Sequence, residues 1–208
     1  QVRHGEGHAL QRMFREFREV LRKPWARVIT LTVFLEGGLV YGAFAFIATH
    51  LHHTHHLSLS AAGTVVMLFG FGGFLFAFGS RQFVSRLGET GLALWGGIAM
   101  FVSLVSVALT PVWWLAVPAC FITGLGFYML HNTLQTNATQ MAPERRGAAV
   151  SAFASCFFLG QSAGLAAAGA STAIVGTRGV ILAGGIGVLF VALWFARLKA
   201  NHQHNVER

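Results

Sequence analysis

The stretch RVITLTVFLEGGLVYGAFAFIAT at residues 27–49 decides the class of fold, because it is long and apolar enough to cross a lipid bilayer as one helix. The whole chain shares this character: 54% of its 208 residues are hydrophobic and only 11% are charged. Soluble domains usually carry about 25% charged residues. The composition therefore predicts an integral membrane protein.

Five more apolar runs of similar length follow the first. Backbone N–H and C=O groups in hydrocarbon must bond to one another, so each run is expected to be a helix. No alternating pattern of about ten residues recurs, which argues against membrane-spanning strands. We therefore predict an all-α integral membrane domain with six transmembrane helices, near residues 27–49, 59–79, 91–110, 113–137, 148–173 and 179–197.

The lysines and arginines predict how these helices are oriented. Of the 15, only Arg178 falls on one side of the membrane in this arrangement, and all the others fall on the opposite side. Loops rich in Lys and Arg stay in the cytoplasm. We therefore expect a protein of the inner (plasma) membrane with both ends of this segment cytoplasmic: a basic amphipathic linker at 1–26, a transmembrane domain at 27–198 and a tail at 199–208.

The segment before the first span repeats apolar residues every three or four positions between residues 10 and 21, with arginines in between. This pattern indicates an amphipathic helix that ends before Pro24. Two placements are open: on the lipid surface, or against the protein's own cytoplasmic face. The net charge of +8 fits a membrane face better than a nucleic acid in so apolar a chain, and no nucleic-acid partner is expected.

Glu36 is the only acidic residue in any predicted span, and it lies within about 3 Å of the centre of the first span at 1.5 Å per residue. An ionised carboxylate facing lipid costs several kcal/mol, so the side chain is expected to face protein or a water-filled cavity. Burial disfavours the charged form of a carboxyl group. We interpret Glu36 as a proton or cation coupling site; the alternative is a protonated carboxyl that only hydrogen-bonds a neighbouring helix.

The second half of span four carries polar residues at three- and four-residue spacing, which places them on one helix face. Such a stripe is expected to line an aqueous pathway or a helix interface. Amide side chains both donate and accept hydrogen bonds, which suits a polar organic solute. The predicted substrate-binding residues are Tyr128, His131, Asn132 and Gln135.

The six spans fall into a three-plus-three pattern. Spans one and four carry polar groups, spans two and five are rich in glycine, and spans three and six are almost entirely apolar. In span five, Gly160 and Gly164 form a GxxxG pair that predicts close helix packing. Internal repeats of this kind are typical of transporters.

A histidine run, HLHHTHH at residues 50–56, follows the first span. Clustered imidazoles bind zinc, nickel or copper, but no Cys or acid accompanies them. We interpret the run as a solvated, pH-sensitive outer loop, and no metal site or cofactor is predicted. The alternative is a metal-ion exporter that uses this loop.

Two loops carry a family resemblance. Pro143, Arg146 and Gly147 match the recurring Pro-x-x-Arg-Gly loop of bacterial drug and sugar efflux members of the Major Facilitator Superfamily. RQFVSRLGE at residues 81–89 resembles a degenerate copy of that family's signature loop, with Arg86 and Gly88 matching. Arg146, Gly147, Arg86 and Gly88 are therefore the predicted conformational loop residues. Arg81, Ser85 and Glu89 depart from the signature.

The chain thus resembles the C-terminal half of a transporter of this superfamily over essentially all of its length. The resemblance implies half of a twelve-helix fold, with a missing N-terminal six-helix half as its partner. It also implies that spans one and four line the central cavity.

The expected function is secondary active transport, namely proton-coupled export of a small organic solute by alternating access. The expected partners are that solute, protons and the lipid bilayer. The sequence holds no HExxH motif, no Ser-His-acid set and no pair of intramembrane acids, so no enzyme is predicted. A non-transporting membrane scaffold is a further alternative.

Overall fold

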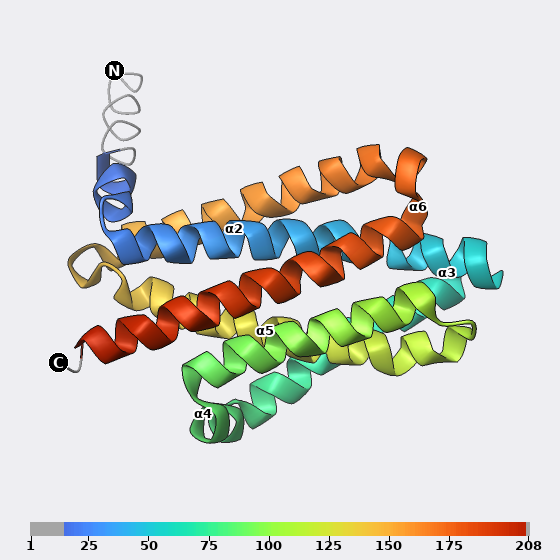
Figure 1. Ribbon diagram of the computed structural model, residues 1–208, viewed down its shortest axis with the longest axis horizontal. Coiled ribbons are helices and arrows are strands. Elements are labelled where there is room, and N and C mark those ends of the chain that lie inside the picture. The colour runs from blue at the N-terminus through green and yellow to red at the C-terminus, as the bar shows by residue number, and fades with distance from the viewer. Residues whose placement is uncertain (1–14, 207–208) are drawn as a thin grey trace, which may run out of the picture.

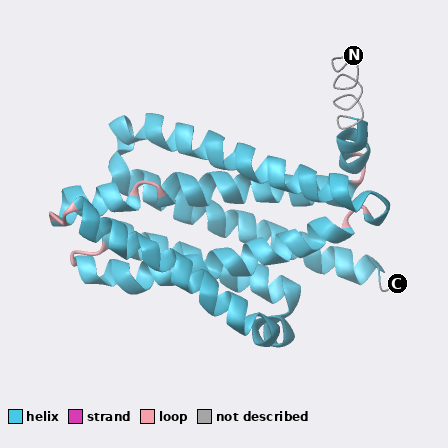
Figure 2. Ribbon diagram, turned by 180° about the vertical axis from the view of Figure 1, so that it is seen from behind, coloured by secondary structure: helices cyan, strands magenta, loops and turns pink. Residues whose placement is uncertain are grey.

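The computed structural model describes residues 15–206, and within them helices joined by short connections form the whole fold, without a strand (Figure 2). The all-helical prediction is therefore confirmed for the described chain. Five α-helices and two short 3₁₀ turns follow the first described residues. They are α2 (Pro24–Phe44), α3 (Ile47–His55), α4 (Leu59–Leu109), η1 (Trp113–Leu115), α5 (Ala116–Gln140), η2 (Pro143–Arg145) and α6 (Arg146–Val206).

Four stretches of the described chain are long and apolar enough to cross a membrane: 24–55, 59–109, 113–140 and 143–204. The structure therefore does not confirm the prediction of six separate transmembrane helices. Two of the expected spans lie within α4, and two more lie within α6.

Both of these long helices are bent at a glycine. Gly88 in α4 has φ 63° and ψ 177°, and Gly176 in α6 has φ 66° and ψ 174°. Side chains rarely tolerate a positive φ, whereas glycine adopts it freely. In Figure 1 each helix turns back on itself there, so that α4 and α6 each have a first arm and a second arm.

The chain enters this bundle through a short helical segment at residues 15–21, which lies across the end of α2 in Figure 1. Pro24 then starts α2, at a position where the missing N–H is not needed. Val20 is fully buried and Phe17 packs against the core, so this part of the amphipathic segment packs against the protein itself. The rest of the predicted amphipathic helix lies outside the described residues.

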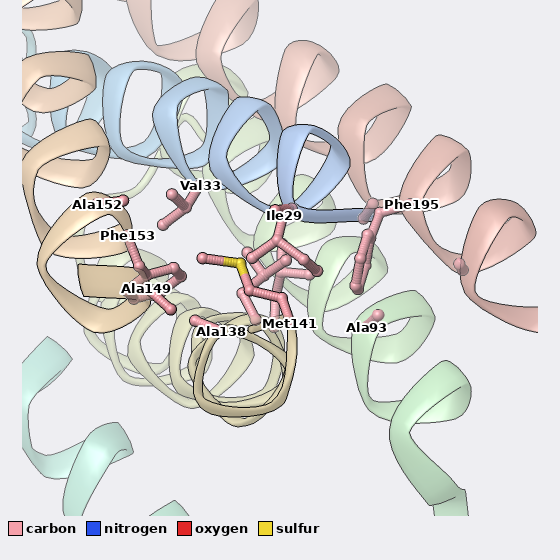
Figure 3. Packing of buried hydrophobic residues seen from close by; sticks show 14 of the residues in the cluster. Ile29, Val33, Ala93, Ala138, Met141, Ala149, Ala152, Phe153 and Phe195 are labelled. Carbon is pink, nitrogen blue, oxygen red and sulfur yellow. The ribbon is translucent and has the colours of Figure 1, made fainter. Parts of the chain in front are cut away.

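The main hydrophobic core joins α2, α4, α5 and α6. Figure 3 shows Ile29 and Val33 of α2 facing Ala138 of α5 and Phe153 of α6, with Phe195 of the second arm of α6 alongside. Because four helices contribute to one cluster, the positions of their polar residues relative to one another are determined by this packing.

The glycine pair Gly160 and Gly164 packs closely against a helix, as predicted, and that helix is α2. A Cβ atom on Gly160 would overlap the backbone of Phe34, and one on Gly164 would overlap the backbone of Gly38. The two helix backbones approach this closely only because no side chain stands between them.

The expectation of a loop at the histidine run is wrong, because residues 47–55 form α3. His50 is buried, and its Nδ1 lies 3.1 Å from the Thr177 hydroxyl beside the bend of α6. His52 Nδ1 donates to the Leu57 carbonyl at 2.7 Å. These contacts hold the imidazoles in a helical turn that the polarity of the run did not predict.

Candidate functional site

The centre of the candidate site is a pair of side chains from two different helices. Glu36 of α2 is completely buried, and its Oε2 lies 2.8 Å from Nδ1 of His131 on α5. The two residues are 95 positions apart in the sequence. The structure therefore brings together the predicted coupling residue and one of the four predicted substrate-binding residues.

Aromatic rings surround the imidazole of His131. Phe127 stacks on it with ring centroids 5.0 Å apart, and Phe157 and Phe153 of α6 lie at 4.8 Å and 5.4 Å. The His131 side chain nevertheless stays 17% exposed. His131 therefore connects a buried carboxyl group to the surface of the bundle through an otherwise apolar wall.

Tyr41, five residues beyond Glu36 on α2, extends this aromatic wall. Its ring meets those of Phe127 and Phe157 edge-on, at centroid distances of 5.6 Å and 5.7 Å. The wall keeps most of the space around the pair apolar, so the charge state of the pair strongly affects the free energy of the site.

The second carboxyl oxygen of Glu36, Oε1, is buried and accepts no hydrogen bond from any residue in 15–206. The pair can share one proton in two ways. Either Glu36 is ionised and a protonated His131 donates through Nδ1, or a neutral Glu36 donates its O–H to Nδ1.

Both arrangements of that proton leave the pair without net charge. Adding or removing a proton leaves a net charge in a buried site, which is costly unless water or another group compensates. The geometry is therefore compatible with one proton shared by the two side chains.

The polar residues of α5 follow one exposed face of the helix. Tyr128 is 39% exposed, Gln135 is also exposed, and His131 and Asn132 are partly buried. The side-chain amides of Asn132 and Gln135 have no hydrogen-bond partner among the described residues, so they are available to a solute.

The hydroxyl groups of Thr136 and Thr139 lie near the same stripe but are used locally. Thr136 donates to the Asn132 carbonyl at 2.9 Å, and Thr139 donates to the Thr136 carbonyl at 2.7 Å. Both bonds stay within α5, so these hydroxyls are less available to a ligand than the amides are.

The predicted conformational loop residues lie at the end of the bundle that also holds the start of α2 and the end of α6 (Figure 1). Gly88 forms the bend of α4, and Arg86 is exposed just before it. Arg146 Nε donates to the Thr139 carbonyl at 3.2 Å, which satisfies one of the free carbonyls at the end of α5. Gly147 has open space around it.

A second polar cluster, which the sequence did not reveal, lies near the same end. Lys199 Nζ of α6 donates to Glu89 Oε2 and to Asn137 Oδ1, both at 2.7 Å. Asn137 Nδ2 in turn donates to Glu89 at 2.8 Å. Lys199 is only 6% exposed although it lies in the predicted tail, and α6 continues past it to Val206.

The signal for this cluster in the sequence was weak. Glu89 was noted only as a departure from a signature, and nothing in the spacing links residues 89, 137 and 199. The cluster joins the bend of α4 to the ends of α5 and α6. Each polar group is satisfied by another, as buried polar groups require.

The described residues contain no group of three or more His, Cys, Asp or Glu side chains that could hold a metal ion. The histidines of α3 thus do not converge with a third ligand of these types within residues 15–206.

Comparison with known proteins decides the family. The family model described as Major Facilitator Superfamily matches residues 2–165, which is well over half of the chain. The chain belongs to the Major Facilitator Superfamily. Searches of curated proteins and of solved structures found no match.

Membership of the Major Facilitator Superfamily makes this chain part of a multi-pass membrane transporter. The superfamily consists of transporters. The matched region includes Glu36, His131 and the polar face of α5.

Proposed function

We propose that this superfamily member exports a small organic solute in exchange for protons, and that the Glu36–His131 pair carries the proton. The observation behind the proposal is the 2.8 Å contact between a fully buried carboxyl group and a partly exposed imidazole. Buried acidic and histidine side chains within membrane spans form the proton relays of pumps and transporters, and this pair has that composition.

The solute would bind along the exposed face of α5, which carries Tyr128, Asn132 and Gln135 next to His131. Because His131 belongs to both the pair and this face, binding of a solute there changes the surroundings of the pair. Protonation of the pair in turn changes the charge that the solute meets. This reciprocity supports exchange through one shared residue.

In the membrane we propose six crossings, with α4 and α6 each crossing twice on either side of Gly88 and Gly176. This arrangement places both ends of the segment in the cytoplasm of an inner-membrane protein, because all Lys and Arg residues except Arg178 then lie on one side. The six helices would form the C-terminal half of a twelve-helix transporter. This half would rock against an N-terminal half during alternating access.

The test uses everted vesicles that contain the intact protein and an acridine dye reporting the pH gradient. A panel of small organic solutes is added, and a solute of the transporter dissipates the gradient only in vesicles with the protein. Glu36→Gln is expected to lower this solute-dependent proton flux at least ten-fold with normal protein content, because the amide cannot exchange a proton.

The matched control is Glu19→Gln, which removes a carboxylate outside the pair, at the beginning of the described chain. It is expected to leave the flux unchanged. If Glu36→Gln vesicles show the same solute-dependent flux as Glu19→Gln vesicles, Glu36 is not the coupling residue. If no solute in the panel dissipates the gradient but labelled solute still moves, transport is not coupled to protons.

A further inference from the structure

A second group of titratable side chains lies where α3 meets the bend of α6, at the end of the bundle opposite to Lys199 (Figure 1). His50 of α3 is only 2% exposed, and its Nδ1 lies 3.1 Å from the hydroxyl oxygen of Thr177, which directly follows the Gly176 bend. The Thr54 hydroxyl reaches the same nitrogen at 3.4 Å. A buried imidazole therefore connects α3 to the bend of α6.

The groups that face His50 do not compensate for an added proton. Arg178 of α6 and His55 of α3 act on its ring electrostatically, and both are cations when protonated. From α4 comes the Val107 carbonyl, which is polar but uncharged. Nε2 of His50 is buried and completes no hydrogen bond of normal geometry with any residue in 15–206.

The carboxylates of the described chain lie elsewhere. Glu36 pairs with His131 inside the bundle, and the other glutamates of residues 15–206 lie at the opposite end, in the segment at 15–21, at the bend of α4 and in η2. A proton on His50 would therefore create a buried cation beside Arg178 with no anion to pair with. An unpaired buried charge is costly, whereas a neutral imidazole is not.

The helical structure of α3 depends on its packing. The helix has nine residues, and residues 45–46 separate it from α2. Isolated helices shorter than about 12–15 residues are marginal in water. The buried side chains of α3 are those of Ile47, His50 and Leu51, and the helix packs against α4 and α6. Loss of the His50 contact would therefore free a helix that is only marginally stable by itself.

From this arrangement we infer that His50 is a proton-sensing site and that its contact with Thr177 is a pH-sensitive latch between α3 and the bend of α6. The latch is closed while His50 is neutral, and protonation opens it because the charged imidazole gains water when it leaves the buried site. A water-exposed imidazole titrates near pH 6.5, so the latch opens as the pH falls below about that value.

The latch lies at one end of the span that carries Glu36, because α3 continues the path of α2. Opening would free this end of the span from α6. In the proposed topology it faces away from the cytoplasm, so the latch would respond to the external pH. The inference depends neither on the transported solute nor on proton coupling at Glu36.

The experiment uses the full chain purified in detergent and measures amide hydrogen exchange by mass spectrometry at pH 7.5 and pH 5.5. Each exchange rate is divided by the intrinsic rate at the same pH, which gives a protection factor. In wild type, protection of residues 47–55 is expected to fall about ten-fold between the two pH values, because only the open state takes up a proton near pH 6.5. Protection in the second arm of α4 is expected to stay unchanged.

Three substitutions separate the latch from general titration of the histidine run. His50→Gln can still form a hydrogen bond but cannot gain a proton, so protection is expected to be the same at both pH values. His53→Gln changes an exposed histidine of the same helix and is expected to keep the ten-fold fall. Thr177→Val removes the hydroxyl group and is expected to lower protection about five-fold already at pH 7.5.

Arg178→Gln tests the latch without a change at His50, and serves if His50→Gln does not fold. A like charge disfavours the protonated form, so its removal is expected to make the fall with pH smaller than in wild type. Arg197→Gln, an exposed arginine at the opposite end of the bundle, is the charge control.

Unchanged protection of α3 in wild type between pH 7.5 and pH 5.5 would overturn the inference. The same ten-fold fall in His50→Gln as in His53→Gln would also overturn it, because another group would then be the sensor. An equal fall in Arg178→Gln and Arg197→Gln would exclude Arg178 as the charge that drives opening.

Discussion

Glu36 and His131 form a hydrogen-bonded pair at 2.8 Å in which the carboxyl group is fully buried and the imidazole is partly exposed. This relationship makes His131 the only described link between the buried acid and the polar face of α5. It also makes the effects of substituting the two residues on protein stability depend on each other, because each side chain satisfies a polar group of the other.

Removal of His131 alone is expected to be more damaging than removal of both partners. His131→Ala leaves a buried carboxyl group without a partner, which costs about 3–5 kcal/mol when the broken pair is charged. The double variant Glu36→Gln/His131→Ala is expected to recover part of that loss. Thermal unfolding of the two single variants and the double variant in detergent measures the coupling, and strictly additive shifts would show that the contact contributes nothing.

Substitution of Gly164 is expected to separate α2 from α6. A Cβ atom at this position would overlap the backbone of Gly38, and neither backbone can move without disturbing the helix packing. Gly164→Ala is therefore expected to cost about 1–3 kcal/mol, as overpacking in a core does. Gly70→Ala, which meets nothing within 4 Å, is the matched control. Equal melting temperatures for the two variants would contradict the close approach.

Gly88→Ala tests the bend of α4 through backbone strain alone. The position has φ 63°, and a Cβ there would meet nothing within 4 Å, so no steric contact contributes. An L-residue at φ 63° and ψ 177°, a region essentially restricted to glycine, costs about 1–3 kcal/mol. Gly63→Ala also has open space but no positive φ, and is expected to be neutral or slightly stabilising. Circular dichroism melts compare the two, and a neutral Gly88→Ala would mean that the bend does not need glycine.

Lys199→Met is expected to destabilise the end of the bundle where α4 bends. The methionine keeps much of the side-chain volume but leaves Asn137 Oδ1 without its donor and Glu89 with only the Asn137 amide as a partner. Loss of a partner from a largely buried polar group costs about 1–3 kcal/mol. Arg197→Met removes an exposed cation two residues earlier and is the control. If both variants melt at the same temperature, the cluster does not stabilise the fold.

The class of fold could be predicted because it depends on composition and on the length of apolar runs. Hydrocarbon forces every backbone group into internal hydrogen bonds, so a run of about 20 apolar residues has essentially one solution. Close helix packing at Gly160 and Gly164 could also be predicted, since a GxxxG pair has no side chains to keep two helix backbones apart. The helix ends were less predictable: α3 forms where a loop was expected, because His50 and His52 gain tertiary and local partners that polarity does not reveal.

The sequence alone determined that this protein is an all-helical membrane protein and that Glu36 is an acid within an apolar span, because both follow from local composition. Only the tertiary structure decided that Glu36 meets His131, that Lys199 joins Glu89 and Asn137, and that α2 and α6 line an apolar groove. Those contacts join residues far apart in the chain, and their distances depend on how four helices pack against one another, which no spacing along the sequence records.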